Sequence, residues 1–168
     1  MNVRKFGKTG INVSEIGLGC WQLGGDWGDV DDYTAQKVLE TSVENGISFY
    51  DTADVYGKGR SEELIHKFLR PLSPNAFIAT KLGRFPEPGN SENYTFENFR
   101  RFTENSLKRL NIDSLDLTQL HCIPTKLMES GEVFDWLRTL KQEGKIKQFG
   151  ASVESISEAQ ICLEQEGL

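Results

Sequence analysis

The stretch that decides the fold is Phe49-Tyr50-Asp51-Thr52-Ala53-Asp54-Val55-Tyr56-Gly57. A short apolar strand, residues 47–50, ends at Asp51, and a compact loop then carries the chain to Tyr56 and Gly57. A β/α barrel places its chemistry on side chains that follow the carboxyl ends of its strands. An acid at a strand end with a phenol on the next loop therefore predicts a site of this kind.

The order strand, loop, helix recurs along the chain. The strands that we expect are 16–19, 47–50, 76–80, 115–120 and 146–150, and the helices are 34–45, 62–69, 95–110, 132–142 and 155–166. Strand 16–19 has the apolar character of a buried strand, and a β-hairpin over residues 3–13 precedes it. Between residues 83 and 93, Pro86, Pro88 and Gly89 indicate a long loop.

This repeat has the length of a βαβ unit and runs without a linker, which predicts one α/β domain with a parallel sheet. A (β/α)8 TIM barrel has eight such units and usually about 250 residues. The chain of 168 residues therefore predicts a single domain, 1–168, that holds the first five or so β/α units of a barrel after the hairpin, a partial barrel.

Local signals set the helix ends. Asn45-Gly46 is a typical helix stop, and Thr95 is suited to cap the helix that follows it. Ser155 and Glu158 match the spacing of a capping box, which predicts the start of the last helix.

Composition excludes several classes of function. The formal charge of −6 argues against a nucleic-acid-binding surface. No apolar run approaches the roughly 20 residues of a membrane span, and no secretion signal is visible at the start. The three cysteines, Cys20, Cys122 and Cys162, lack zinc spacing and suggest reduced thiols in a cytoplasmic protein.

Four polar residues come from three successive strand ends, so a barrel would gather them on one rim. They are Asp51, Tyr56, Lys81 and His121. A free phenol keeps its proton to about pH 10, so a nearby cation such as Lys81 would be needed to favour the phenolate. Asp51 would hold Lys81 charged and oriented.

In the same arrangement His121 would donate a hydrogen bond to a substrate carbonyl, and Tyr56 would pass that oxygen a proton as general acid. The four residues include no hydride donor, which a nicotinamide cofactor would supply. Taken singly, each residue has an ordinary structural role as a turn, packing or strand-end residue. Their common register favours a site, whereas for Trp21 and Trp27 pocket lining and simple packing both remain open.

With these residues in view, the chain resembles the aldo-keto reductase family, in particular the N-terminal portion of its bacterial-type members. The resemblance rests on several segments together: Phe6-Gly7-Lys8-Thr9-Gly10, Val13 to Gly19, Phe49 to Ala53 with Tyr56-Gly57, Ala79-Thr80-Lys81, Ser106 to Leu110, Leu120-His121, Gly144-Lys145-Ile146 and Phe149-Gly150.

The resemblance implies a (β/α)8 barrel that reduces aldehydes and ketones to alcohols with NADPH. It makes Tyr56 the proton donor, Lys81 its partner, Asp51 the support of Lys81, and His121 the residue that orients the carbonyl. It also places Gly19, Trp21, Asp51 and Ser152 at the cofactor. The chain departs from the family in two ways: Val153 replaces the asparagine that usually follows Ser152, and the last three strands, with most of the cofactor-binding groups, are absent.

Other functions stay open. Without its closing strands the sheet would leave unpaired edges, which favour self-association. The chain could then be a catalytically silent fragment, or an interaction or nucleotide-sensing protein on the same fold. A metal-dependent hydrolase is a more distant alternative, because two histidines without an HxH pair offer few ligands, and we expect no metal site.

Overall fold

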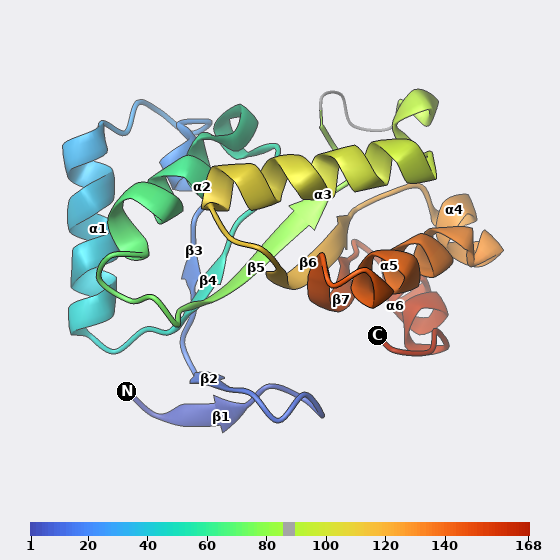
Figure 1. Cartoon of the computed structure of the whole chain (residues 1–168), viewed down its shortest axis with the longest axis horizontal. Coiled ribbons are helices and arrows are strands. Elements are labelled where there is room, and N and C mark those ends of the chain that lie inside the picture. Colours follow the sequence, from blue (N-terminus) through green and yellow to red (C-terminus); the bar gives the residue numbers. More distant parts are fainter. Residues whose placement is uncertain (86–89) are drawn as a thin grey trace. The chain divides into compact units, whose positions relative to one another are not determined.

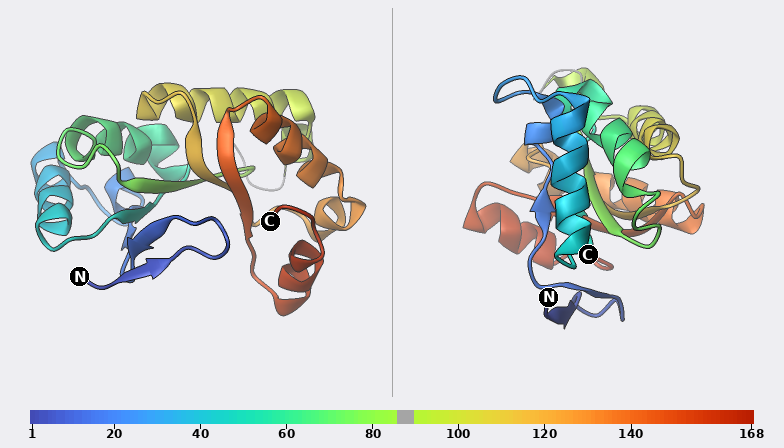
Figure 2. Two further views of the ribbon diagram at one scale, coloured as in Figure 1. Left: turned by 60° about the horizontal axis from the view of Figure 1, so that its bottom comes forward. Right: turned by 90° about the vertical axis from the view of Figure 1, so that its left-hand side faces the viewer.

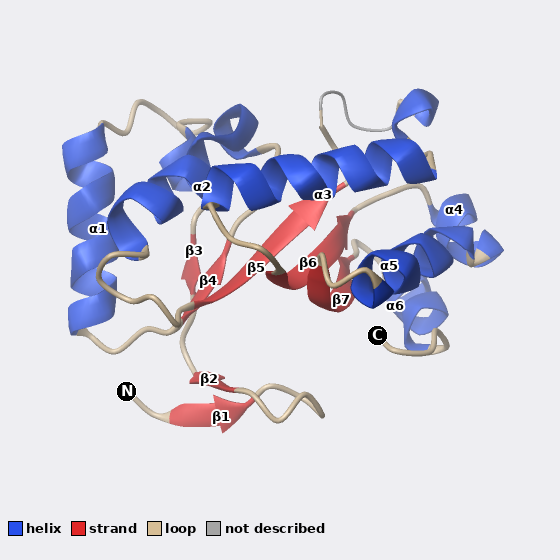
Figure 3. Ribbon diagram, viewed as in Figure 1, coloured by secondary structure: helices blue, strands red, loops and turns tan. Residues whose placement is uncertain are grey.

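The computed structural model describes residues 1–85 and 90–168 (Figure 1). Pro86, Pro88 and Gly89 of the expected loop lie outside the described residues, and the loop's later part holds a short 3-10 turn, η4 (Ser91–Asn93). The chain divides into two compact units, Met1–Ala79 and Thr80–Leu168. The secondary structure is α/β, with helices and strands alternating along the chain (Figure 3).

Five strands form the main sheet, as the sequence predicts. Their order is β3 (Leu18–Gly19), β4 (Phe49–Asp51), β5 (Phe77–Leu82), β6 (Leu115–His121) and β7 (Ile146–Ser152). The pairs β3 with β4, β4 with β5, and β6 with β7 are all parallel. Strand β5 begins in the first unit and ends in the second.

The predicted hairpin is confirmed. Strands β1 (Val3–Lys5) and β2 (Asn12–Ser14) pair antiparallel with Arg4 opposite Val13, and Figure 2 shows them side by side. The Phe6 ring, just after β1, lies 5.2 Å from Phe77 and 5.8 Å from Phe49, centroid to centroid. Within the N-terminal unit, aromatic packing therefore attaches the hairpin to β4 and β5.

The strand expected over residues 16–19 is present in part, but it is not buried as predicted. Strand β3 is two residues long, and Ile16 just before it is 56% exposed. β3 stands at the end of the strand order, so β4 is its one neighbour within residues 1–85 and 90–168. An apolar strand buries both sides only when elements cover it on both faces and edges.

The helices of the N-terminal unit differ from expectation in two details. Helix α1 (Asp32–Glu44) begins two residues early because the Asp31 carboxylate accepts from the Thr34 N–H at 2.7 Å and caps it. The second helix is α2 (Arg60–Leu64), which continues as a π turn, η3 (Ile65–Leu69). Leu39 of α1 and both ends of η3 are fully buried, so this pair of helices supplies much of the unit's core.

In the C-terminal unit, α3 (Phe96–Leu110) packs on α5 (Glu132–Gln142), as Figure 1 shows. The Phe99 ring meets Trp136 edge-on with centroids 5.1 Å apart. The Arg100 guanidinium makes a two-pronged ion pair with Glu143, at 2.6 Å and 2.5 Å. Helix α5 has the predicted bounds, and α3 starts at the predicted cap, Thr95, whose hydroxyl accepts from the Asn98 N–H.

Sequence analysis missed one helix, α4 (Thr125–Ser130), which lies between Pro124 and Gly131. The final helix, α6 (Ile156–Leu163), carries the predicted capping box between Ser155 and Glu158 and ends three residues before the expected position. Strands β6 and β7 pair along their length, so that His121 lies opposite Ser152.

Candidate active site

In the N-terminal unit, the strand ends bring Gly19 and Asp51 side by side. Gly19 of β3 is the register partner of Asp51, the last residue of β4, and Asp51 is in turn opposite Ala79 of β5. The chain leaves both strands through backbone bonds: Cys20 N–H donates to Asp51 O at 2.8 Å, and Thr52 N–H donates to Ala79 O at 2.8 Å. The predicted residues Gly19 and Asp51 thus stand at the same carboxyl edge.

Tyr56 and Trp21 also come together. Their rings are stacked, with centroids 5.7 Å apart and planes inclined by 16°. Trp21 also contacts Trp27, with centroids 4.6 Å apart, and its indole N–H donates to the Asp26 carboxylate at 3.0 Å. Tyr56 is 9% exposed, whereas Trp21 and Trp27 are 42% and 66% exposed. The two tryptophans therefore form an open aromatic surface beside a nearly buried phenol.

The loops that carry these rings touch through two glycines. A Cβ added to Gly57 would lie 2.3 Å from the carbonyl oxygen of Gly24, and a Cβ added to Gly24 would lie 2.6 Å from the Gly57 nitrogen. Gly57 also has φ +58°, in the left-handed region that favours glycine. The two backbones can approach this closely because neither residue has a side chain.

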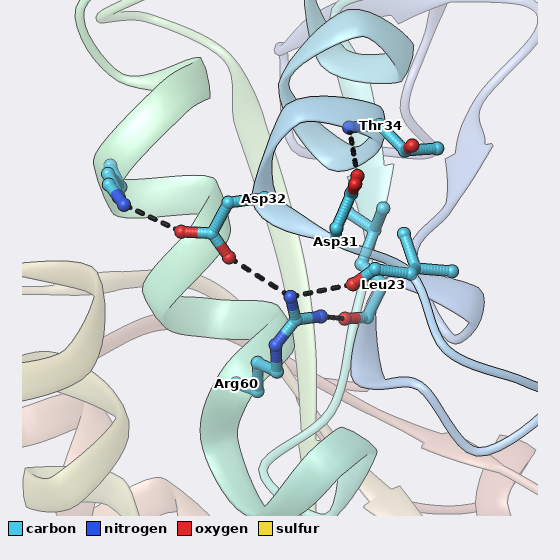
Figure 4. A network of polar contacts seen from close by, with 7 residues as sticks. Leu23, Asp31, Asp32, Thr34 and Arg60 are labelled. Atoms are coloured by element: carbon cyan, nitrogen blue, oxygen red, sulfur yellow. Dashed lines mark hydrogen bonds and ion pairs between the residues drawn. The ribbon is translucent and has the colours of Figure 1, made fainter.

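Arg60 joins the same two loops, and sequence analysis did not single it out. Its guanidinium donates to the carbonyl oxygens of Leu23 and Val30 and to the Asp32 carboxylate (Figure 4). The Val30 bond is 2.7 Å long and the Asp32 bond 3.1 Å. Backbone carbonyl acceptors leave no mark in a sequence, so residue spacing gives no signal for this contact.

In the C-terminal unit, Lys81 and His121 belong to the ends of their strands rather than following them. Lys81 is in β5 and His121 is the last residue of β6, and they are 6% and 7% exposed. Charged side chains are seldom buried to this extent without a specific arrangement around them. Ser152 closes β7 opposite His121, as the register requires.

The imidazole of His121 is neutral at physiological pH. Burial, together with the positive charges of Lys81 and Arg84, lowers the pKa of His121 from 6.5 to about 3. A neutral imidazole has one N–H donor and one acceptor nitrogen. His121 is therefore suited to give a hydrogen bond to a carbonyl oxygen without itself carrying a charge.

The residue after His121 fixes how the chain leaves β6. Cys122 has φ +48°, its N–H donates to Ser152 O at 2.9 Å, and its sulfur lies 3.8 Å from the Ser152 hydroxyl. Gly83, with φ +110°, approaches the same turn, since an added Cβ would lie 2.7 Å from Ile123. These contacts hold His121 and Ser152 at one edge of the unit.

The predicted residues thus form two sets. Gly19, Trp21, Asp51 and Tyr56 lie in the N-terminal unit, and Lys81, His121 and Ser152 lie in the C-terminal unit. Within the first set the structure joins Gly19 to Asp51 and Trp21 to Tyr56. Within the second set, His121 is the register partner of Ser152, and the positive charge of Lys81 helps to lower the pKa of His121.

Comparison with known proteins shows the family. The model of the aldo/keto reductase family matches residues 15–168, and the chain belongs to that family. It is 35% identical over 164 residues to the aldo-keto reductase YhdN of Bacillus subtilis, covering 94% of this chain and 49% of the relative. The resemblance drawn from the sequence motifs is therefore confirmed.

Solved structures agree with this assignment. The holo form of aldo-keto reductase AKR11C1 from Bacillus halodurans superposes with a TM-score of 0.77 at 30% identity, covering 91% of this chain and 50% of that one. An aldo-keto reductase from Klebsiella pneumoniae, solved in complex with NADPH, gives 0.73 at 27% identity, covering 90% and 50%. The fold is therefore that of a (β/α)8 barrel in part, as the strand count predicts.

The chain spans about half the length of the curated relatives that it matches. Among its described residues, no helix is long and apolar enough to cross a membrane.

Proposed function

We propose that this chain takes part in NADPH-dependent reduction of aldehydes and ketones to alcohols. The observation that carries the proposal is the buried, neutral His121 beside the charge of Lys81 at the carboxyl ends of neighbouring strands. A neutral N–H donor close to a fixed positive charge suits an oxygen on which negative charge develops. Family membership supports the same chemistry.

Each residue has one task in this proposal. Tyr56 gives the proton to the carbonyl oxygen, and the stack with Trp21 limits the directions in which its hydroxyl can point. Lys81 favours release of that proton through its charge, Asp51 supports Lys81, and His121 donates a hydrogen bond that orients the carbonyl. No metal takes part.

The end of β3 leaves room for a nicotinamide group. An added Cβ at Gly19 would meet no atom within 4 Å, so the space beside this strand end is open. Gly19, Trp21, Asp51 and Ser152 would hold the cofactor, whereas Val153 has no amide to offer its carboxamide. When bound, NADPH supplies the hydride.

Two further properties follow from the proposal. The partner is a small carbonyl compound, and neither nucleic acid nor a membrane is involved. Cys20, Cys122 and Cys162 form no disulfide within the described residues, in keeping with the reducing conditions of the cytoplasm. In this proposal residues 1–168 form a single aldo-keto reductase-like domain that is shorter than a full barrel.

A cofactor titration tests the proposal. NADPH added to the 168-residue chain is expected to bind saturably by nicotinamide fluorescence and to be oxidised when a simple aldehyde is added. Lys81→Met is expected to abolish the oxidation, and Lys126→Met, at an exposed position of α4, to leave it unchanged. Equal rates in the two variants would contradict the role of Lys81.

A second candidate is an interaction protein that self-associates. One observation favours it: a groove of about 350 Å³ lies between the hairpin, β3 and β4, and Phe6, Val13, Leu18 and Phe49 are among its lining residues. Light scattering that rises with protein concentration in the wild type, and not in Leu18→Lys, would support this function. A monomer at all concentrations would reject it.

A further inference from the structure

Arg60 contacts the Tyr56 loop through its backbone. It is the first residue of α2, and its N–H is directed at the carbonyl oxygens of Tyr56 and Gly57. The preceding residue, Gly59, has φ +98°, a conformation that lets the chain turn sharply from the loop into the helix. The position of Arg60 is therefore fixed by the same turn that positions the phenol.

Its side chain contacts the other loop. The guanidinium donates to Leu23 O, next to the Gly24 that meets Gly57, and to Val30 O at 2.7 Å (Figure 4). Trp21 and Trp27 both lie on this loop. One residue thus joins the turn that carries Tyr56 to two points, Leu23 and Val30, of the loop that carries the aromatic surface.

Arginine is suited to this task because its planar fork offers five N–H donors in fixed directions. Two nitrogens of the fork satisfy two carbonyls and the Asp32 carboxylate at once. A lysine has a single ammonium at the end of a flexible chain and could not reach both carbonyls in the same geometry. The carbonyl contacts, rather than the charge, are thus what Arg60 alone provides.

Lys67 offers a control that separates the effect of the ion pairs from the effect of the carbonyl contacts of Arg60. Its ammonium lies 2.7 Å from the other oxygen of Asp32, so it shares the ion-pair network with Arg60. The hydrogen bonds of Lys67 in this network go to Asp32 and to neither loop carbonyl. A change at Lys67 therefore disturbs the ion pairs and leaves the carbonyl contacts in place.

From these contacts we infer that Arg60 is a positioning residue that holds the Trp21 loop against the Tyr56 loop and so fixes the Trp21–Tyr56 stack in its reactive arrangement. The part of this inference that concerns catalysis rests on the proposed function. The part that concerns the loop does not, because the contacts of Arg60 are the same whatever the site does.

The test compares Arg60→Met, Arg60→Lys and Lys67→Met with the wild-type chain, by two readouts. The first is the circular-dichroism exciton signal of the closely spaced Trp21–Trp27 pair, which needs no activity. The second is carbonyl-dependent NADPH oxidation, resolved into kcat and KM. Thermal unfolding followed in the far ultraviolet confirms that each variant is folded.

We expect Arg60→Met to lose most of the exciton signal and to lower kcat roughly 10- to 100-fold, since a small misplacement of a reacting group has effects of that size. Arg60→Lys should recover only part of both, and Lys67→Met should keep both. A folded Arg60→Met or Arg60→Lys with a wild-type exciton signal would overturn the inference, as would an equal loss in Lys67→Met. If Arg60→Met does not fold, the exciton signal and kcat of Arg60→Lys decide whether the inference holds.

The experiment can reject the proposed function and the role of Arg60 independently of each other. A wild-type chain without carbonyl turnover would reject the proposed function, and the exciton signal would still decide the role of Arg60 in the loop. Turnover that is unchanged in Arg60→Met despite a lost exciton signal would reject the catalytic part of the inference and leave the proposed function intact.

Discussion

The backbone of Gly24 lies directly against that of Gly57, so close that a Cβ on Gly57 would be 2.3 Å from the Gly24 carbonyl oxygen. This contact lies between Trp21 on one loop and Tyr56 on the other, whose rings stack. Space for a methyl group at this point would therefore have to come from separating the two loops. The site in the N-terminal unit depends on the absence of two side chains as much as on the presence of others.

Gly57→Ala should lower the free energy of unfolding by about 3 kcal/mol, combining the strain of a positive φ with overpacking against backbone. Gly10→Ala is the matched control, because Gly10 also has positive φ but an added Cβ would meet nothing within 4 Å. It should lose only about 1 kcal/mol. Urea unfolding measures both, and equal losses would contradict the close approach.

Thr118→Val should stabilise the protein. Thr118 is fully buried in β6, and its hydroxyl has no hydrogen-bond partner within the residues that the structure describes. Removing an unsatisfied buried hydroxyl at constant shape should raise the free energy of unfolding by about 1 kcal/mol.

The matched control is Thr103→Val. Thr103 is equally buried, but its hydroxyl donates to Phe99 O at 2.8 Å. Its loss should destabilise the protein by about 0.5–1 kcal/mol. Urea unfolding of the two variants should therefore give changes of opposite sign, and a destabilised Thr118→Val would show that its hydroxyl is satisfied.

The low pKa of His121 predicts how stability depends on pH. Burial and the charges of Lys81 and Arg84 lower the pKa of His121 to about 3, against 6.5 for the exposed group. Between these values the unfolded chain binds a proton at this residue and the folded chain does not. The contribution of His121 to the free energy of unfolding is therefore constant above about pH 6.5 and falls by about 1.4 kcal/mol per pH unit below it.

His121→Gln removes this contribution, so its unfolding free energy should fall less steeply than that of the wild type as the pH is lowered from 6.5. The difference in slope between the two proteins is the measurement, because the carboxylates titrate in both. Parallel slopes would mean that His121 is protonated in the folded chain.

Local sequence signals predicted most of the fold because the interactions that they describe are themselves local. Helix α5 has its predicted bounds, and the capping box at Ser155 is present as expected. The strand that ends at Asp51 and the loop to Tyr56 follow from an apolar run and a turn in the same way. The π turn over residues 65–69 was not predictable, since the spacing of apolar residues in so short a segment does not distinguish a π turn from an α-helix.

What the sequence could not show depends on contacts between distant residues. The exposure of Ile16 follows from the place of β3 at the end of the sheet, and the role of Arg60 follows from carbonyl groups on another loop. For the candidate site, the pairs Trp21–Tyr56 and His121–Ser152 are observed in the structure. The catalytic roles of Asp51, Tyr56, Lys81 and His121 remain predictions.

The rate of carbonyl-dependent NADPH oxidation in Tyr56→Phe, compared with Tyr33→Phe, tests the central claim most directly. Both changes remove one hydroxyl, but Tyr33 is 68% exposed on α1 and lies outside the candidate site. We predict a loss of at least about 100-fold in kcat for Tyr56→Phe, with NADPH binding retained, and no change for Tyr33→Phe. Equal turnover in the two variants would show that Tyr56 is not the proton donor.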